Sequence, residues 1–343
     1  MEITPGGSRL DVGKLPAALL SRLIAAHGAS GSDILVGPGI GRDAAAIAVG
    51  DAILVAKTDP ITFATHDAPA YLVDVNANDI ACLGATPKWL LVTSLLPVGT
   101  TDEEVEHLFG QLGEACVRRG IGLIGGHTEV TTSVDRPVLV GMMLGEATRE
   151  TLVRPGAARP GDALLLSGSI ALEGTALLAN ERSEALTGIL GPDIVASAKR
   201  LMVDPGISVA NAVSALIGTP GVHAFHDPTE GGIATGVREL AEAAGCGVIV
   251  RREAIPVHPE TAAIADALGL DPLGMLASGS LVVAVAPEAV AEACARAASK
   301  GVSLVAFGEL TPAEYGCVLV ENGSQRELPE WTTDEISKAL ASI

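Results

Sequence analysis

Acidic or polar residues stand beside glycine-rich turns at five places in this sequence. They are Asp43, Asp59, the pair Asn76 and Asp79, His127, and Asp227. Carboxylate and amide oxygens are the ligands that hard cations such as Mg²⁺ prefer, and glycine lets backbone N–H groups approach a phosphate closely. Aspartate and asparagine also occur beside turns simply because they hydrogen-bond to the local backbone. The pattern therefore indicates a metal–polyphosphate site, with ordinary turn chemistry as the alternative.

The first of these places is the stretch Gly37–Asp59, GPGIGRDAAAIAVGDAILVAKTD. Two short apolar runs, Ala44–Val49 and Ala52–Ala56, are joined by a Gly-Asp dipeptide, which is typical of a β-hairpin. Asp43 enters the first expected strand, and Asp59 leaves the second. A hairpin would place both carboxylates at the same end.

A helix is expected over Pro69–Gly84, because Gly84 can end it and Pro87 prevents its continuation. Leu72, Asn76, Asp79 and Leu83 fall on one stripe of this helix. Either the stripe is a solvated edge, or Asn76 and Asp79 point inward at a bound ion.

Two further glycine segments carry possible ligands. The segment Gly125–Glu129, GGHTE, is expected to be a turn after a short strand, and His226–Gly232, HDPTEGG, is expected to join a strand to a helix. Helix N-termini expose unsatisfied N–H groups and attract anions. A capped helix start would explain the second segment equally well.

Composition limits the class of protein. The chain has 343 residues, a net charge of −19 and a mean hydropathy of +0.42, with only 2% aromatic residues. This charge disfavours nucleic acid and anionic membranes as partners, and no apolar run reaches the roughly 18 residues of a membrane span. The five cysteines are scattered without a CxxC pair, which favours reduced thiols and a cytoplasmic location.

The order of expected elements predicts two domains of mixed α/β (α+β) class. A strand-rich half covers residues 1–150, and a half of alternating strands and helices covers residues 151–343. The boundary is placed where RETLVRPGAARPGD interrupts the apolar periodicity.

Several motifs together resemble the aminoimidazole-ribonucleotide-synthetase (AIR synthase) superfamily, which includes thiamine-monophosphate kinase, selenophosphate synthetase and the hydrogenase-maturation dehydratase. The matching segments are GIGRDAAAI, KTDP, VNANDIACLGATP, GGHTEV, GDALLLSG and HDPTEGGIATGVRELAEAAGCGVIV. The stretch IPVHPETAAIADALGLDPLGMLASGSLVVAV is most like the hydrogenase-maturation branch. The resemblance extends over roughly residues 30–320.

The resemblance implies ATP and Mg²⁺ as ligands, held in a cleft between an N-terminal domain, which pairs with its twin in a barrel-like homodimer core, and a C-terminal α/β domain. It implies Asp43, Asp59 and Asp79 as metal ligands. The expected nucleotide-binding residues are Gly39, Gly41, Lys57, Asn76, Gly125, Gly126, Thr128, Gly231 and Gly232. The candidate catalytic residues are Asp227, His127 and His66. Candidates for a general base are His66, His127, His226 and Glu173.

The sequence also departs from its relatives. It ends KALASI with its last cysteine at Cys317, so we expect the tail-dehydration reaction of the hydrogenase-maturation branch not to run in its usual form. Ala277-Ser278-Gly279 stands where that branch tends to have Asn-Glu-Gly. A basic residue is frequent near the start of the helix at 69–84, and the nearest candidates here are His66 and Lys57.

Three hypotheses follow. The first is an ATP- and Mg²⁺-dependent enzyme that activates a small-molecule or protein-borne acceptor by phosphoryl transfer. The second is a small-molecule kinase similar to thiamine-monophosphate kinase. The third is a non-catalytic, nucleotide-binding maturation or regulatory partner.

Overall fold

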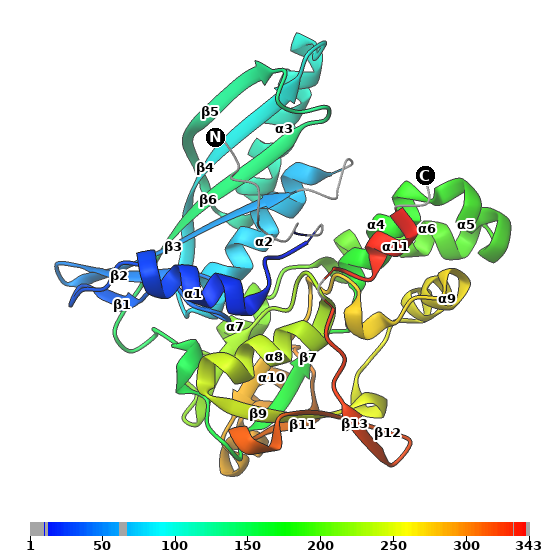
Figure 1. The fold of residues 1–343 in the computed structure, drawn as a ribbon. Helices are drawn as coiled ribbons and strands as arrows, with labels where there is room; N and C mark the ends of the chain where they lie inside the picture. The colour runs from blue at the N-terminus through cyan, green and yellow to red at the C-terminus, as the bar shows by residue number, and fades with distance from the viewer. Residues whose placement is uncertain (1–9, 11–12, 62–66, 332, 341–343) are drawn as a thin grey trace.

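The computed structural model describes residues 10, 13–61, 67–331 and 333–340. Its strands form two sheets, one in each half of the chain (Figure 1). The mixed α/β (α+β) class predicted from the sequence is confirmed. The first sheet ends at Ala147 and the second begins at Ala163; the boundary at residue 150 stays a prediction.

The first sheet is antiparallel except for one parallel pair, β4 and β5. Its strands in spatial order are β1 (Ile34–Val36), β2 (Ala45–Val49), β3 (Ala52–Ile61), β6 (Val138–Ala147), β4 (Thr86–Pro97) and β5 (Gly122–Thr131). Strands β2 and β3 pair from Ala45 opposite Ala56 to Val49 opposite Ala52, which confirms the expected hairpin. Strand β3 runs on past the expected end, so Asp59 lies inside it.

Three helices belong to this half: α1 (Ala17–His27), α2 (Ala68–Cys82) and α3 (Asp102–Arg119). Helix α2 packs against β3, β6 and α3, and twelve of its fifteen residues are buried. Helix α3 begins with a capping box between Thr101 and Glu104 and ends at Gly120, whose φ of 66° suits a left-handed cap. Helices α2 and α3 lie on one face of the sheet (Figure 1). Gly141 and Gly145 of β6 face α2, so Met142, which is 45% exposed, points to the opposite face.

The second sheet is antiparallel except for the parallel pair β12 and β9. Its strands in spatial order are β13 (Ser324–Glu327), β12 (Cys317–Glu321), β9 (Cys246–Arg251), β11 (Leu304–Pro312), β7 (Ala163–Ser167), β10 (Leu281–Val285) and β8 (Val222–His226). All five residues of β10 are buried. Alternate residues of β10 face opposite sides, because Val282 packs in a cluster with α8 and Val283 in a cluster with α7 and α10.

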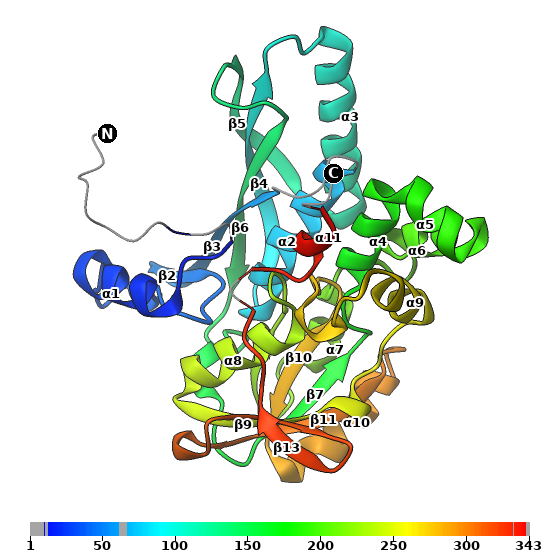
Figure 2. The same cartoon turned by 45° about the vertical axis from the view of Figure 1, so that its right-hand side comes forward.

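The helices of the second half form two groups. Helices α7 (Ala210–Leu216), α8 (Gly232–Ala244) and α10 (Val290–Ala298) sandwich the sheet. A separate cluster lies to one side (Figure 2) and consists of α4 (Leu172–Glu181), α5 (Ser183–Leu190), α6 (Pro192–Arg200), α9 (Pro259–Leu268) and α11 (Ile336–Leu340). The sequence did not predict α5, α6 and α9. None of the described helices combines the length and apolar character that a membrane crossing needs.

Helix α2 joins the two halves. Its residues Ala81 and Cys82 belong to the same apolar cluster as β10 and α7. The buried Asn78 side chain donates to the carbonyl of Ile207 (2.8 Å) and accepts from the N–H of Val209 (2.9 Å). The site described below lies at this junction.

Candidate functional site

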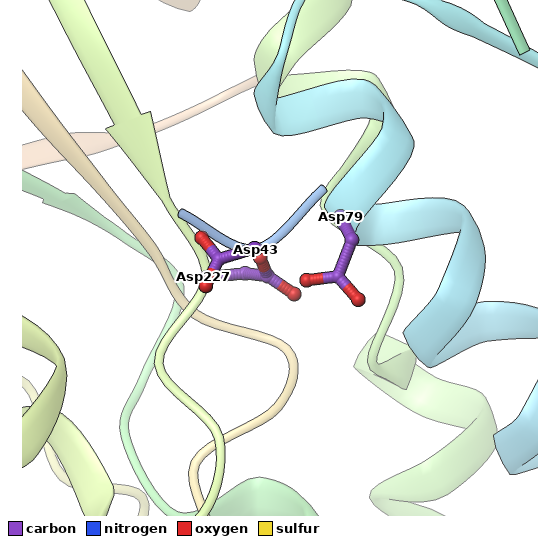
Figure 3. A group of neighbouring side chains, drawn as sticks. All are labelled: Asp43, Asp79 and Asp227. Carbon is purple, nitrogen blue, oxygen red and sulfur yellow. The ribbon is translucent and has the colours of Figure 1, made fainter. Parts of the chain in front are cut away.

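Three carboxylates from distant parts of the chain meet at the junction of the two halves (Figure 3). Asp43 precedes β2, Asp79 lies on α2, and Asp227 follows β8. One oxygen from each lies within 4.8 Å of the others. The sequence predicted Asp43 and Asp79 as metal ligands and Asp227 as a catalytic residue; the structure brings all three together.

Asp43 reaches this position because the turn before it packs tightly onto α8. Gly41 has a φ of +64°, and a Cβ at this residue would lie 2.2 Å from the carbonyl oxygen of Glu239. Only glycine accepts both this conformation and this contact. The packing thus accounts for Gly41 without a phosphate. At Gly39, a Cβ would lie 2.8 Å from the Arg42 side chain.

His226 holds Asp43 in place. Its Nδ1 lies 2.8 Å from Oδ2 of Asp43, and its Nε2 lies 3.4 Å from Oε2 of Glu239. Lys14 contacts Glu239 in turn, at 3.0 Å. Burial opposes the imidazolium, but the two carboxylates raise the pKa of His226 well above its usual value. A cation between two carboxylates is a poor proton acceptor, so the structure argues against His226 as the general base.

The effect on Asp43 is reciprocal. Burial favours its protonated form, but His226, assisted by Lys57 and Lys14, lowers the pKa of Asp43 to about 2. Asp43 is therefore a carboxylate at neutral pH and available as a ligand.

Lys57 lies between two further acidic residues. Its Nζ is 3.0 Å from Oδ2 of Asp79 and 3.4 Å from Oδ2 of Asp59. These carboxylates raise the pKa of Lys57 in spite of its burial. Asp59 therefore faces the lysine, outside the set of three close carboxylates, and its role as a metal ligand stays a prediction.

Ionising Asp227 and Asp79 at the same time is energetically unfavourable. Burial, followed by the nearby Asp43, raises the pKa of Asp227 to about 7, although His226 and Lys57 act in the opposite direction. Burial also raises the pKa of Asp79 well above its usual value, against the effect of Lys57. The Cys82 thiol also acts to lower the pKa of Asp227, although neither oxygen of Asp227 accepts a hydrogen bond of normal geometry from the described residues. Buried carboxylate oxygens that converge in this way fit a hard divalent cation such as Mg²⁺.

Asp43, Lys57, Asp59 and Asp79 line a cavity of about 220 Å³, and Asp227 lies beside it in contact range of Asp43 and Asp79. On its wall, Glu173 from α4 is 5% exposed and Ser278 is 1% exposed. Oε2 of Glu173 lacks a hydrogen-bond partner in the described part of the chain. Burial raises the pKa of Glu173 to about 7, despite the opposing effect of Ser278. Glu173 can therefore exchange a proton near neutral pH.

The Asn76 side chain is buried, as expected if its side of the helix points inward. It hydrogen-bonds to backbone carbonyl groups. Its Nδ2 donates to the carbonyl of Leu72 (2.9 Å) and to that of Asp59 (3.4 Å). It does not line the cavity. Its assistance to a bound metal stays a prediction.

Gly231 and Gly232 begin α8 with φ values of +81° and +69°. The N–H of Gly231 donates to the buried Asp334 side chain (2.7 Å), and a Cβ on Gly232 would lie 2.3 Å from the carbonyl oxygen of Leu273. Both glycines thus have structural reasons for their identity. Their contact with a nucleotide stays a prediction.

The expected turn at residues 125–129 is wrong. Gly125, Gly126, His127 and Thr128 lie within β5, which pairs in parallel with β4 along its length. The His127 side chain is 62% exposed and faces Glu129 at 3.2 Å. These residues line a different cavity, beside Phe109 of α3. Within a single chain they therefore lie apart from the three carboxylates. His66 lies outside the described residues.

Sequence reasoning missed Lys14 and Glu239, the outer members of the charge chain that runs through His226 to Asp43. Glu239 stands seven residues after Gly232 on α8, so its face could have been derived from helical periodicity. Lys14 had no local signal, because its partner Glu239 lies 225 positions away in the sequence.

Comparison with known proteins agrees with the fold and the motifs. Residues 41–147 match the sequence model of the N-terminal domain of AIR synthase related proteins, and residues 159–320 match that of the C-terminal domain. The chain is 30% identical over 253 residues to a hydrogenase expression/formation protein of Methanocaldococcus jannaschii, covering 72% of each. It is 33% identical over 255 residues to the carbamoyl dehydratase HypE of Rhizobium leguminosarum bv. viciae, covering 72% of this chain and 70% of the relative.

A solved structure of the hydrogenase maturation protein HypE in complex with ATP superimposes with a TM-score of 0.69 at 25% identity. The match covers 81% of this chain and 85% of that one. Sequence and structure therefore agree that this chain belongs to the family of AIR synthase related proteins.

Proposed function

We propose that this protein is an ATP- and Mg²⁺-dependent enzyme that activates a small substrate group by phosphoryl transfer. The observation that carries the proposal is the convergence of Asp43, Asp79 and Asp227, two of which, Asp43 and Asp79, line a cavity between the two halves. The similarity to a HypE structure solved with ATP supports ATP as the nucleotide.

Each residue then has a defined task. Asp43, Asp79 and Asp227 would hold Mg²⁺, which offsets the charge of the nucleotide phosphates. His226 and Glu239 keep Asp43 ionised and fixed in orientation. Lys57, held by Asp79 and Asp59, adds positive charge at the cavity wall.

Glu173 is the general base that the geometry favours. Of the other candidates, His226 is engaged by two carboxylates and His127 lies on β5 beside another cavity. Glu173 lines the same cavity as Asp43 and Asp79, and burial raises its pKa to about 7. It would accept the proton of a hydroxyl, amine or amide group on the acceptor as that group attacks the γ-phosphorus of ATP and the bond to the departing ADP breaks.

Nucleotide binding tests the proposal directly. Mg-ATP should raise the melting temperature of the purified chain, because a ligand that binds only the native state stabilises it. Asp43→Ala and Asp79→Ala should stay folded and lose this rise. Asp51→Ala, which changes an exposed aspartate at the opposite end of the same hairpin, should keep it.

If the parent shows no rise at millimolar Mg-ATP, or if both site variants bind as well as the parent, the proposal is wrong. A panel of candidate acceptors, followed by phosphate release and mass change, distinguishes a catalyst from a nucleotide-binding partner without activity.

We further propose that the chain is a homodimer. The sheet face opposite α2 and α3 exposes Met142, and β5 forms an open edge with Ile124 and Val130 each 55% exposed. An open strand edge beside apolar side chains is a surface that a second copy can cover.

A further inference from the structure

A second cavity, of about 540 Å³, lies beside the beginning of β8, whereas Asp227 follows the end of that strand. Its walls come from Leu35 and Ile53 of the first sheet, from the connection at 149–159, and from the turn that leads into β8 at 218–223. It shares no lining residue with the cavity that contains Asp43 and Asp79. Both halves of the chain therefore contribute to it.

The cavity is basic in a chain that is strongly acidic overall. Arg149, Arg154 and Arg159 line it, and Glu150 is the acidic residue among its lining residues. The whole chain has 41 acidic and 22 basic residues. The lining of this cavity, with three arginines and one acidic residue, therefore carries a net positive charge, whereas the chain as a whole is negative.

The guanidinium groups are not used to hold the fold. Within the described ranges, no side-chain hydrogen bond or ion pair engages any of these three arginines, whereas Arg119 and Arg252 pair with carboxylates. The buried Asp162 has other partners: it accepts from the backbone N–H of Arg159 and contacts Nδ1 of His223, both at 2.8 Å.

A neutral donor completes the lining. Thr219 is only 4% exposed, and its hydroxyl has no hydrogen-bond partner among the described residues. A buried hydroxyl without a partner is unfavourable, and a ligand oxygen would satisfy it. This observation is independent of the arginine cluster and also indicates an acceptor-rich ligand.

The arginines are carried by a firmly held segment. The N–H of Val153 donates to the carbonyl of Leu83 (3.0 Å), and Leu152 packs on the first core. At Gly84, a Cβ would lie 1.8 Å from the carbonyl oxygen of Thr151, so the backbones of these two residues pack directly against each other. The backbone that carries the arginines is thus fixed before a ligand binds, which lowers part of the entropic cost of binding.

We propose that this cavity is a second ligand site, which takes a multivalent oxyanion such as a phosphate or pyrophosphate group. Guanidinium groups bind phosphate oxygens through charge-assisted, often paired, hydrogen bonds. The Thr219 hydroxyl donates to the same group. The proposal does not depend on the function of the aspartate cavity.

Inorganic pyrophosphate in EDTA is the probe that isolates this site, because without a divalent cation the three aspartates repel anions. Isothermal titration of the full chain should show one saturable site that weakens as salt is added. Arg149→Ala and Arg159→Ala should each weaken the affinity by about tenfold, and Thr219→Val by about threefold. Arg118→Ala, an exposed arginine on α3, should leave it unchanged.

Asp79→Ala should also keep pyrophosphate binding in EDTA, which separates this proposal from the nucleotide site. The arginine variants remove exposed side chains, so their unliganded melting temperature should match the parent. No saturable binding, or equal binding in the parent and the Arg149→Ala/Arg159→Ala double variant, would overturn the proposal.

Two arms identify the source of the phosphate. If AMP and ADP bind no better than phosphate and pyrophosphate respectively, the site takes the free anion. If they bind more tightly and the arginine variants lose that binding, the site takes the phosphate end of a nucleotide. Either result supports the proposed site, provided that the arginine variants lose the binding.

Discussion

Asp227 shows how burial and neighbouring charge prepare a residue for a metal. Its pKa rises to about 7 because it is buried beside Asp43, whose own pKa falls to about 2 through His226. Asp43 is thus charged at neutral pH, whereas Asp227 is only partly ionised there in the metal-free protein. The sequence placed both aspartates beside glycine turns, but this difference depends on a histidine from the second half of the chain.

The raised pKa of Asp227 predicts that the free energy of unfolding of the metal-free protein depends on pH. The folded-state pKa of Asp227 lies above its unfolded value, so the folded state holds the proton more tightly, and its free energy of unfolding falls as pH rises from about 4 to about 7. Asp227→Asn should remove this fall, with an effect on the order of a few kcal/mol at pH 8. Urea unfolding in EDTA at several pH values measures it, with Asp51→Asn as control. An unchanged pH slope in Asp227→Asn contradicts the assignment.

Metal binding should follow the same protonation. Mg²⁺ must displace the proton that Asp227 holds, so the affinity for Mg-ATP should fall as pH is lowered from 7.5 to 5.5, by up to about tenfold per unit. Titration calorimetry in two buffers with different ionisation enthalpies reports the released proton. Binding without proton release at pH 6 would count against Asp227 as a ligand.

Glu173 gives a second test at this scale. Glu173→Gln keeps the size of the side chain but cannot accept a proton, so turnover of an identified acceptor should fall by about 10²–10⁴-fold. The melting-temperature rise with Mg-ATP should remain, because the residue is not a metal ligand in this assignment. Glu184→Gln on α5 is the control. Loss of nucleotide binding in Glu173→Gln would instead indicate a role in the nucleotide site.

Among the elements, local patterns predicted those with a clear beginning and end. The β2–β3 hairpin and α2 were found because Gly50 and Gly84 mark their limits. Strand β5 was mistaken for a turn because two adjacent glycines usually indicate one. Its strand conformation comes from pairing with β4, a contact between distant residues that no local pattern reveals.

Gly41 and Gly50 offer a matched test of element packing. Their φ values are +64° and +61°, but a Cβ on Gly50 meets open space, whereas one on Gly41 lies 2.2 Å from the Glu239 carbonyl. Gly50→Ala should cost about 1 kcal/mol through strain alone, and Gly41→Ala about 3 kcal/mol or more. Chemical denaturation measures both. Equal costs would mean that the turn does not press against α8.

At the scale of the whole molecule, the sequence predicted two strand-containing halves and their class, because strand and helix patterns alternate along the chain. The sequence did not predict helices α5, α6 and α9, which pack on one another and on α4, away from the sheet. The assembly of the three carboxylates could be expected only from the family resemblance, since the residues are separated by up to 184 positions, from Asp43 to Asp227.

The proposed homodimer can be tested on the exposed sheet. Ile124→Glu should shift the mass in light scattering from dimer to monomer, because it places a charge on the open strand β5. Val203→Glu, at a residue that is 85% exposed outside this sheet, should leave the mass unchanged. A monomeric parent would refute the homodimer.

The two hydrogen bonds of Asn78 have a consequence for how the molecule moves. They fasten α2, which carries Asp79, to the second half of the chain, and the shared cluster of Ala81 and Cys82 surrounds that joint with apolar contacts. A swing of one half away from the other would expose this cluster and break both bonds. A ligand must therefore reach the carboxylates by local adjustment of the cavity mouth, and the two halves should unfold as one cooperative unit.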